Sequence, residues 1–258
     1  MPTQSTDDTD ETDHTDETHR ASADRAAADT ASTDTPPTET NWQVSYDDVD
    51  PIRIRDPVAE ALCVLDPGDP FVVDYADVVM VAGHSCPTAA GAYRLTQLAL
   101  DALYPAADSA ASDVGDTGEL PVRGDIEVLA GGPRDDSTYG VMSRLVSTIT
   151  GAAQEDGFGG LAGGHGARRD MLHFQDLDRV EPTFQFRRTD TGATVEVTYH
   201  VSAVPSAGPA TSHLPELVDG TATQADRDEF ASAWHARVGT VLSDDDLFTV
   251  DPIEWALD

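Results

Sequence analysis

The first 42 residues contain almost no side chain that a hydrophobic core could bury, and this confines any folded domain to residues 43–258. Asp, Glu, Thr, Ser and Ala make up most of the segment, with 11 acids against two arginines. A chain of this composition cannot offset the entropy lost on ordering. We therefore expect residues 1–42 to be a disordered acidic tail, in which His14 and His19 are solvated.

The acidic character extends beyond this tail. The 258 residues include 48 acids and 15 basic residues, all of them arginine, for a formal charge of −33. This lysine-free composition resembles that of haloarchaeal proteomes and indicates adaptation to molar salt, where a Debye length of about 3 Å screens self-repulsion. The charge argues against nucleic acid and anionic membranes as partners. Because we find neither a signal peptide nor a membrane span, we expect a cytoplasmic protein.

Residues 83–94, Gly-His-Ser-Cys-Pro-Thr-Ala-Ala-Gly-Ala-Tyr-Arg, are the most informative stretch. Apolar residues at helical spacing follow it, and proline suits the first position of a helix. The spacing predicts a helix from Pro87 to Tyr104 with Cys86 as its N-cap. The helix dipole and unpaired backbone N–H groups favour a thiolate at this position. His84 lies close enough in sequence to share a metal with Cys86 or to act as its base.

Three interpretations of this turn are open. Cys86 and His84 are ligand types that suit zinc or another transition metal, with His165, His173 or His200 as a further ligand. In the second interpretation, Cys86 is a nucleophile activated by its helix and by a histidine. In the third, Cys86 only caps the helix, and His84 forms a hydrogen bond within the turn.

The remaining pattern mixes helices and strands without sustained βαβ alternation, which favours an α+β fold, a mixed β-sheet packed with helices in a single core domain. We expect a short helix after Asp56 that extends to Leu65, with Cys63 buried on its apolar face. The other expected elements are a strand at 122–130, a helix from Asp135 or Asp136 to Gly151, a strand at 170–175, a hairpin of 183–188 with 194–201, a helix at 225–238 and a C-terminal segment at 251–255 that docks as a cap.

The motif Gly-His-x-Cys-Pro followed by Gly-x-Tyr-Arg, with an apolar helix behind it, resembles the hallmark of the FmdE family, named after a component of formylmethanofuran dehydrogenase. Residues 74–82 are similar to that family's short amphipathic lead-in, and a looser resemblance covers residues 57–201. Thr88 replaces the family's usual glycine, and Ala152 takes the place of its second cysteine.

The resemblance implies a mixed sheet with helices over residues 43–258, including a C-terminal extension, and often a homodimer. It favours a transition-metal-binding protein with a role in metal handling or as a molybdoenzyme-linked accessory. His84, Cys86 and His200 are then the expected metal ligands, and zinc is the expected ion. Because the second family cysteine is missing, histidine or acid must complete the coordination.

The alternative function is a cysteine-dependent enzyme that acts on a small anionic substrate. Cys86 is then the nucleophile and His84 or His200 the base. Tyr93, Arg94 and Arg168 are the residues expected to hold the substrate. A third hypothesis is a non-catalytic partner protein in which the motif only shapes the start of a helix.

Overall fold

The structure is a computed structural model, which describes residues 39–105 and 118–257. The disordered tail expected at residues 1–42 lies, up to residue 38, outside the described residues. The chain divides into two compact units after Trp42, and all the helices and strands that the structure describes belong to the second unit. In the part of the chain that is described, no helix combines the length and the apolar character needed to cross a membrane.

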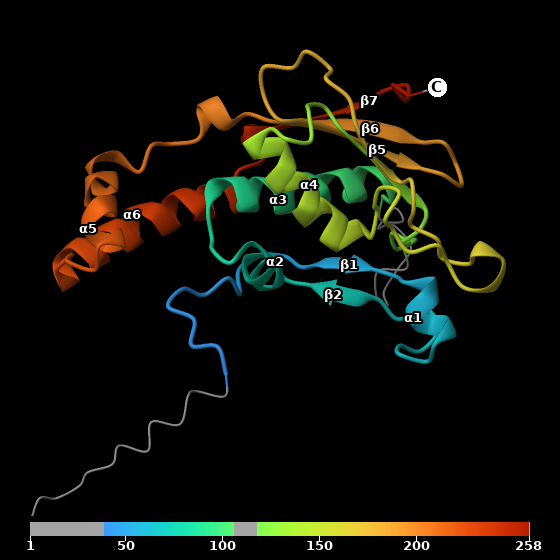
Figure 1. Ribbon diagram of the computed structural model, residues 1–258, viewed down its shortest axis with the longest axis horizontal. Coiled ribbons are helices and arrows are strands. Elements are labelled where there is room, and N and C mark those ends of the chain that lie inside the picture. Colours follow the sequence, from blue (N-terminus) through green and yellow to red (C-terminus); the bar gives the residue numbers. More distant parts are fainter. Residues whose placement is uncertain (1–38, 106–117, 258) are drawn as a thin grey trace, which may run out of the picture. The chain divides into compact units, whose positions relative to one another are not determined.

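A five-stranded mixed sheet forms one layer of the fold (Figure 1). Its strands are, in spatial order, β4 (Leu172–Phe174), β3 (Ile126–Ala130), β5 (Thr183–Arg188), β6 (Thr194–Tyr199) and β7 (Phe248–Pro252). β3 and β4 are parallel, and the other neighbours are antiparallel. The expected hairpin is confirmed as β5 and β6, whose alternating residues pair Phe184 with Val197.

Two helices, α3 (Pro87–Leu103) and α4 (Ser137–Thr150), pack side by side against this sheet (Figure 1). Close approach of α3 to β6 requires a glycine. A Cβ at Gly91 would overlap the ring carbons of Tyr199, well inside van der Waals contact. The N-terminal half of α3 is therefore held directly against the end of β6.

A smaller layer covers the side of these helices that faces away from the sheet (Figure 1). It contains α2 (Tyr75–Ala82) and an antiparallel pair of strands, β1 (Ile52–Ile54) and β2 (Phe71–Val73), with α1 (Pro57–Ala61) between the two strands in sequence. After β6 the chain forms α5 (Leu214–Val218) and α6 (Gln224–Ser243). Short 3₁₀ segments lie at Ala162–Gly164, Val201–Ala203, Gly208–His213 and Asp245–Leu247.

The predicted α+β class is confirmed, and so are several helix ends. Asp136 caps α4 by accepting hydrogen bonds from the backbone N–H groups of Thr138 and Tyr139, and Gly151 ends the helix in the left-handed conformation at φ 78°. The C-terminal segment expected at 251–255 overlaps β7, an edge strand that pairs with β6 over Phe248–Pro252, only at its first two residues. Beyond the strand, the Ile253 N–H donates to the Thr194 carbonyl at 3.1 Å.

Cys63 requires a correction. The helix α1 ends at Ala61, and Cys63 lies beyond it at φ 56° with an exposed side chain. The expectation that Cys63 is buried on an apolar helix face is therefore wrong. The physical reason is that its apolar neighbours Leu62 and Val64 have little to pack against, being 59% and 64% exposed.

Candidate functional site

The His84–Cys86 turn joins α2 to α3, and both of its ends follow from sequence. Gly83, at φ 76°, ends α2 in the left-handed conformation that glycine adopts without strain. Pro87 occupies the first turn of α3, and Cys86 is its N-cap with extended backbone at φ −152°. The predicted position of Cys86 is thus confirmed.

The Cys86 sulfur is half-buried and accepts a hydrogen bond from the backbone N–H of Ala89 at 3.4 Å. Two buried tyrosines, Tyr75 and Tyr199, lie beside the turn. Burial raises the pKa of both phenols, which are protonated at neutral pH and can donate hydrogen bonds.

His84 is exposed, and its Nδ1 lies 3.0 Å from the carbonyl oxygen of Ala82. Since a carbonyl only accepts, this contact makes Nδ1 the donor, and in the neutral ring the lone pair is then on Nε2. A histidine that binds a metal through one nitrogen commonly donates its other N–H to a backbone carbonyl in this way. His84 has the tautomer required of a ligand or a base.

Three aromatic side chains hold the turn, and the sequence pattern predicted none of these roles. The Tyr75 hydroxyl shares a 3.1 Å hydrogen bond with the Ser85 hydroxyl, and Tyr199 donates to the Pro87 carbonyl at 3.2 Å. The indole of Trp234 donates to the Ser85 carbonyl at 2.8 Å. No local pattern signals contacts that come from α2, β6 and α6.

Tyr93 and Arg94, predicted as substrate-binding residues, have partners within the protein. Tyr93 is fully buried, and its hydroxyl lies 3.0 Å from the carbonyl oxygens of Asp50 and Val73. Arg94 forms an ion pair with Asp245 and donates to Gln97. Their role in substrate binding stays a prediction.

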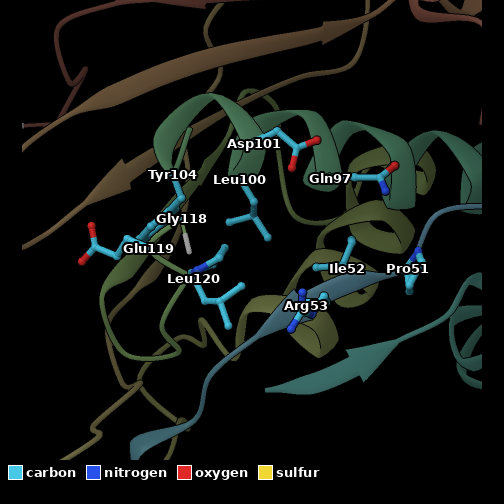
Figure 2. A pocket seen from close by; sticks show the side chains of 11 residues that line it. Pro51, Ile52, Arg53, Gln97, Leu100, Asp101, Tyr104, Gly118, Glu119 and Leu120 are labelled. Carbon is cyan, nitrogen blue, oxygen red and sulfur yellow. The ribbon is translucent and has the colours of Figure 1, made fainter. Parts of the chain in front are cut away.

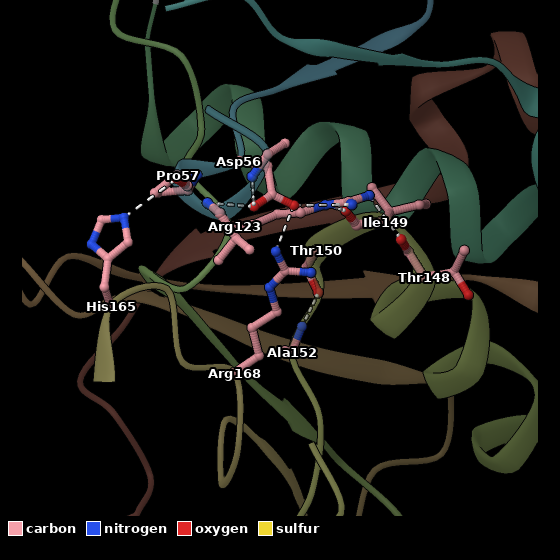
Figure 3. Close-up of polar contacts among 11 residues, drawn as sticks. Asp56, Pro57, Arg123, Thr148, Ile149, Thr150, Ala152, His165 and Arg168 are labelled. Carbon is pink, nitrogen blue, oxygen red and sulfur yellow. Dashed lines mark hydrogen bonds and ion pairs between the residues drawn. The ribbon is translucent and has the colours of Figure 1, made fainter. Parts of the chain in front are cut away.

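Arg168 forms a buried cluster with Asp56 (Figure 3). Its guanidinium lies 2.5 Å from Asp56 Oδ2, and that of Arg123 lies 3.6 Å from the same oxygen. Burial alone would raise the pKa of Asp56, but Arg168 and the N–H groups of Ala59 and Val58 outweigh it and lower the pKa. Arg168 thus binds a carboxylate of its own chain, and its contact with a substrate also stays a prediction.

The other candidate histidines are separated from one another. His173 on β4 contacts Glu127 at 2.9 Å, and β3 and β5 lie between its strand and β6. His165 contacts the Pro57 carbonyl at 3.3 Å, beside the Asp56 cluster (Figure 3). His200 follows Tyr199 at the end of β6, and its Nε2 lies 2.7 Å from Thr249 Oγ1. His200 is therefore next in sequence to Tyr199, whose hydroxyl bonds to the Pro87 carbonyl at the turn.

These residues do not form a complete metal cage within one chain. Across residues 39–105 and 118–257, no group of three or more His, Cys, Asp or Glu side chains is arranged to hold a metal ion. His84 and Cys86 together supply at most two ligands to a metal ion. A metal bound there needs further ligands from outside this group.

A separate surface pocket of about 300 Å³ lies at the C-terminal half of α3 (Figure 2). Ile52 and Leu100 contribute apolar surface, and Arg53, Asp101 and Glu119 contribute charged groups. Burial raises the pKa of Asp101, and Arg94 only partly opposes this. None of the residues predicted to form the site lines this pocket.

No protein-family model matches this chain, and the search of characterised proteins finds no significant match.

Proposed function

We propose that this chain is a transition-metal-binding protein of the FmdE type, in which His84 and Cys86 bind one ion, zinc in the first instance. The observation that carries the proposal is the contact between His84 Nδ1 and the Ala82 carbonyl. It leaves the Nε2 lone pair exposed two residues from a cysteine sulfur. Imidazole nitrogen and thiolate are the ligand pair that zinc and similar ions prefer.

The position of the sulfur supports the same proposal. A metal-bound cysteine must be a thiolate, and a helix N-terminus favours negative charge. The N–H of Ala89 already points at the sulfur and can stabilise that charge. Cys86 therefore has a stabilising environment for the ligand form.

Two protein ligands leave coordination positions open, as in sites that handle metal or bind a small molecule. His200 is the nearest candidate in topology, because Tyr199 beside it contacts Pro87. His200 Nε2 is bonded to Thr249 Oγ1, so His200 would bind the same ion through Nδ1 or after giving up that hydrogen bond. A second copy of the chain in a homodimer is the other source of ligands.

The proposed affiliation with the FmdE family rests on the motif at residues 83–94. The proposed salt-adapted, cytoplasmic setting rests on the charge of −33 and the absence of lysine. Both proposals agree with a role in metal handling or as an accessory to a molybdoenzyme.

One observation favours the alternative, an enzyme with Cys86 as nucleophile. The Ala89 N–H that stabilises a metal-bound thiolate would equally stabilise a free one. In that case His84 Nε2 is the candidate base, and the protein would carry a reactive thiol without metal.

Metal analysis of protein purified in molar salt tests the proposal. We expect stoichiometric zinc or a similar ion in the wild type and its loss in Cys86→Ser and in His84→Ala. Serine is itself a preferred N-cap, so Cys86→Ser preserves the start of α3. Cys63→Ser and His173→Ala are matched controls that should retain the metal, since these residues lie on other elements.

Wild-type protein that stays metal-free after incubation with zinc, cobalt, nickel or iron would overturn the metal proposal. A rapidly alkylated Cys86 in that protein would support the enzyme. An inert, metal-free thiol would contradict both functions.

A further inference from the structure

The C-terminal helix α6 reaches the His84–Cys86 turn through a polar contact. Trp234 lies 149 residues after Ser85 in the sequence, and its indole N–H donates to the Ser85 carbonyl at 2.8 Å. We propose that Trp234 is a positioning residue for Cys86, and that α6 thereby controls the metal affinity of the turn. This inference rests on the proposed function, since it assigns a role to the same site.

The Ser85 carbonyl is well placed to set the direction of the sulfur. It belongs to the planar peptide unit that links Ser85 to Cys86. Fixing its oxygen fixes the orientation of the Cys86 nitrogen and α-carbon, from which the side chain projects. The Tyr75 hydroxyl restrains the Ser85 side chain, and Tyr199 restrains the following carbonyl at Pro87. Loss of the indole N–H would remove the direct restraint on the Ser85 carbonyl and let the Ser85–Cys86 peptide tilt, although the Cys86 carbonyl stays bonded to the Ala90 N–H.

The ring of Trp234 and its N–H make separate contributions. The ring stacks on Phe230, with centroids 5.4 Å apart and planes at 16°, and packs against the core. Another aromatic ring can preserve that packing. The N–H is the group that bonds to the turn, so a change from tryptophan to phenylalanine removes the positioning contact with little loss of apolar contact.

The test compares Trp234→Phe with the wild type in a Cys63→Ser background, so that Cys86 is the sole thiol. Trp255→Phe is the matched control, because its indole packs near Arg187 and His173 instead. Three quantities are measured: the affinity for zinc, the sulfur-to-metal charge-transfer band with cobalt, and the rate of Cys86 alkylation without metal. Circular dichroism verifies that each variant is folded.

We expect zinc binding to weaken about 10- to 100-fold in Trp234→Phe, the usual effect of removing an outer hydrogen bond at a metal site. The cobalt band should shift, and Trp255→Phe should match the wild type. Trp234→Gln, which loses the ring but retains a side-chain N–H, should regain part of the affinity. It also provides the second test if the phenylalanine variant fails to fold.

Unchanged zinc affinity, cobalt band and alkylation rate in folded Trp234→Phe would overturn the inference. If the wild type binds no metal but Trp234→Phe alters the alkylation rate several-fold, the proposed metal function fails while the positioning role stands. If the wild type binds metal and the variant is indistinguishable from it in all three measurements, the function stands and the positioning role fails.

Discussion

Two helices of this protein begin with the same device, a capping side chain followed by proline, and the two caps differ in what they bind. Asp56 precedes Pro57 at α1, and Cys86 precedes Pro87 at α3. The Asp56 carboxylate is 4% exposed and binds two backbone N–H groups and Arg168. The Cys86 sulfur is half-buried and accepts a hydrogen bond from the Ala89 N–H at 3.4 Å.

The difference separates a structural cap from a candidate functional one. Asp56 joins the start of α1 to Arg168, in the loop between α4 and β4, and, through Arg123, to the carbonyls of Thr148 and Ile149 at the end of α4 (Figure 3). Its carboxylate oxygens accept hydrogen bonds from groups of the same chain, which stabilises the fold. Cys86 is a weak cap whose sulfur can still bind another group, which is what a ligand or nucleophile requires.

The largest expected effect follows from removing the structural cap. Asp56→Ala should lower the free energy of unfolding by about 3 kcal/mol, because it removes a cap and leaves the Arg168 charge without its buried partner. Urea denaturation at fixed high salt measures this. The control is Asp136→Ala, an exposed N-cap without an ion pair among the described residues, for which we expect about 1 kcal/mol. Equal losses would show that the ion pair adds nothing to the cap.

A smaller loss of stability is expected from a change in α3, the helix that Cys86 caps. Gly91→Ala should destabilise the protein by about 1–3 kcal/mol, because the new methyl group collides with the Tyr199 ring. That ring cannot move freely, since it stacks on Phe248 and bonds to Pro87. Thermal denaturation should show the opposite sign for Gly239→Ala, a control in α6 with open space, where alanine normally stabilises a helix by about 0.5–1 kcal/mol. A stabilised Gly91→Ala would contradict the close packing of α3 on β6.

The smallest expected effect is a change with pH in the contribution of Asp56 to the free energy of unfolding. Because its pKa in the folded state lies below the ordinary value of 3.8, its contribution to stability is complete above that value and is lost as the pH falls through the lowered pKa. The stability difference between wild type and Asp56→Asn should therefore shrink below about pH 4. Denaturation between pH 7 and pH 3 measures it. A difference that grows toward acid pH would mean that Asp56 is not held as the carboxylate.

Local features of this protein could be predicted from the order of its residues. Proline after a polar side chain indicated both helix starts, the glycine at position 151 indicated the end of α4, and alternation indicated the β5–β6 hairpin. These features depend on the conformational limits of a few adjacent residues, which act before any distant part of the chain is in place. Cys86 was located in the same way.

The groups that meet at the turn depend instead on packing. Trp234 and Tyr199 reach it from distant elements, whereas Arg94 and Arg168 pair with carboxylates at Asp245 and Asp56. Ion pairs and hydrogen bonds between distant residues form only when whole helices and strands have packed together. The exposure of Cys63 also depends on packing, because α1 ends at Ala61 and the residues that follow it, Leu62 to Val64, find no surface to pack against.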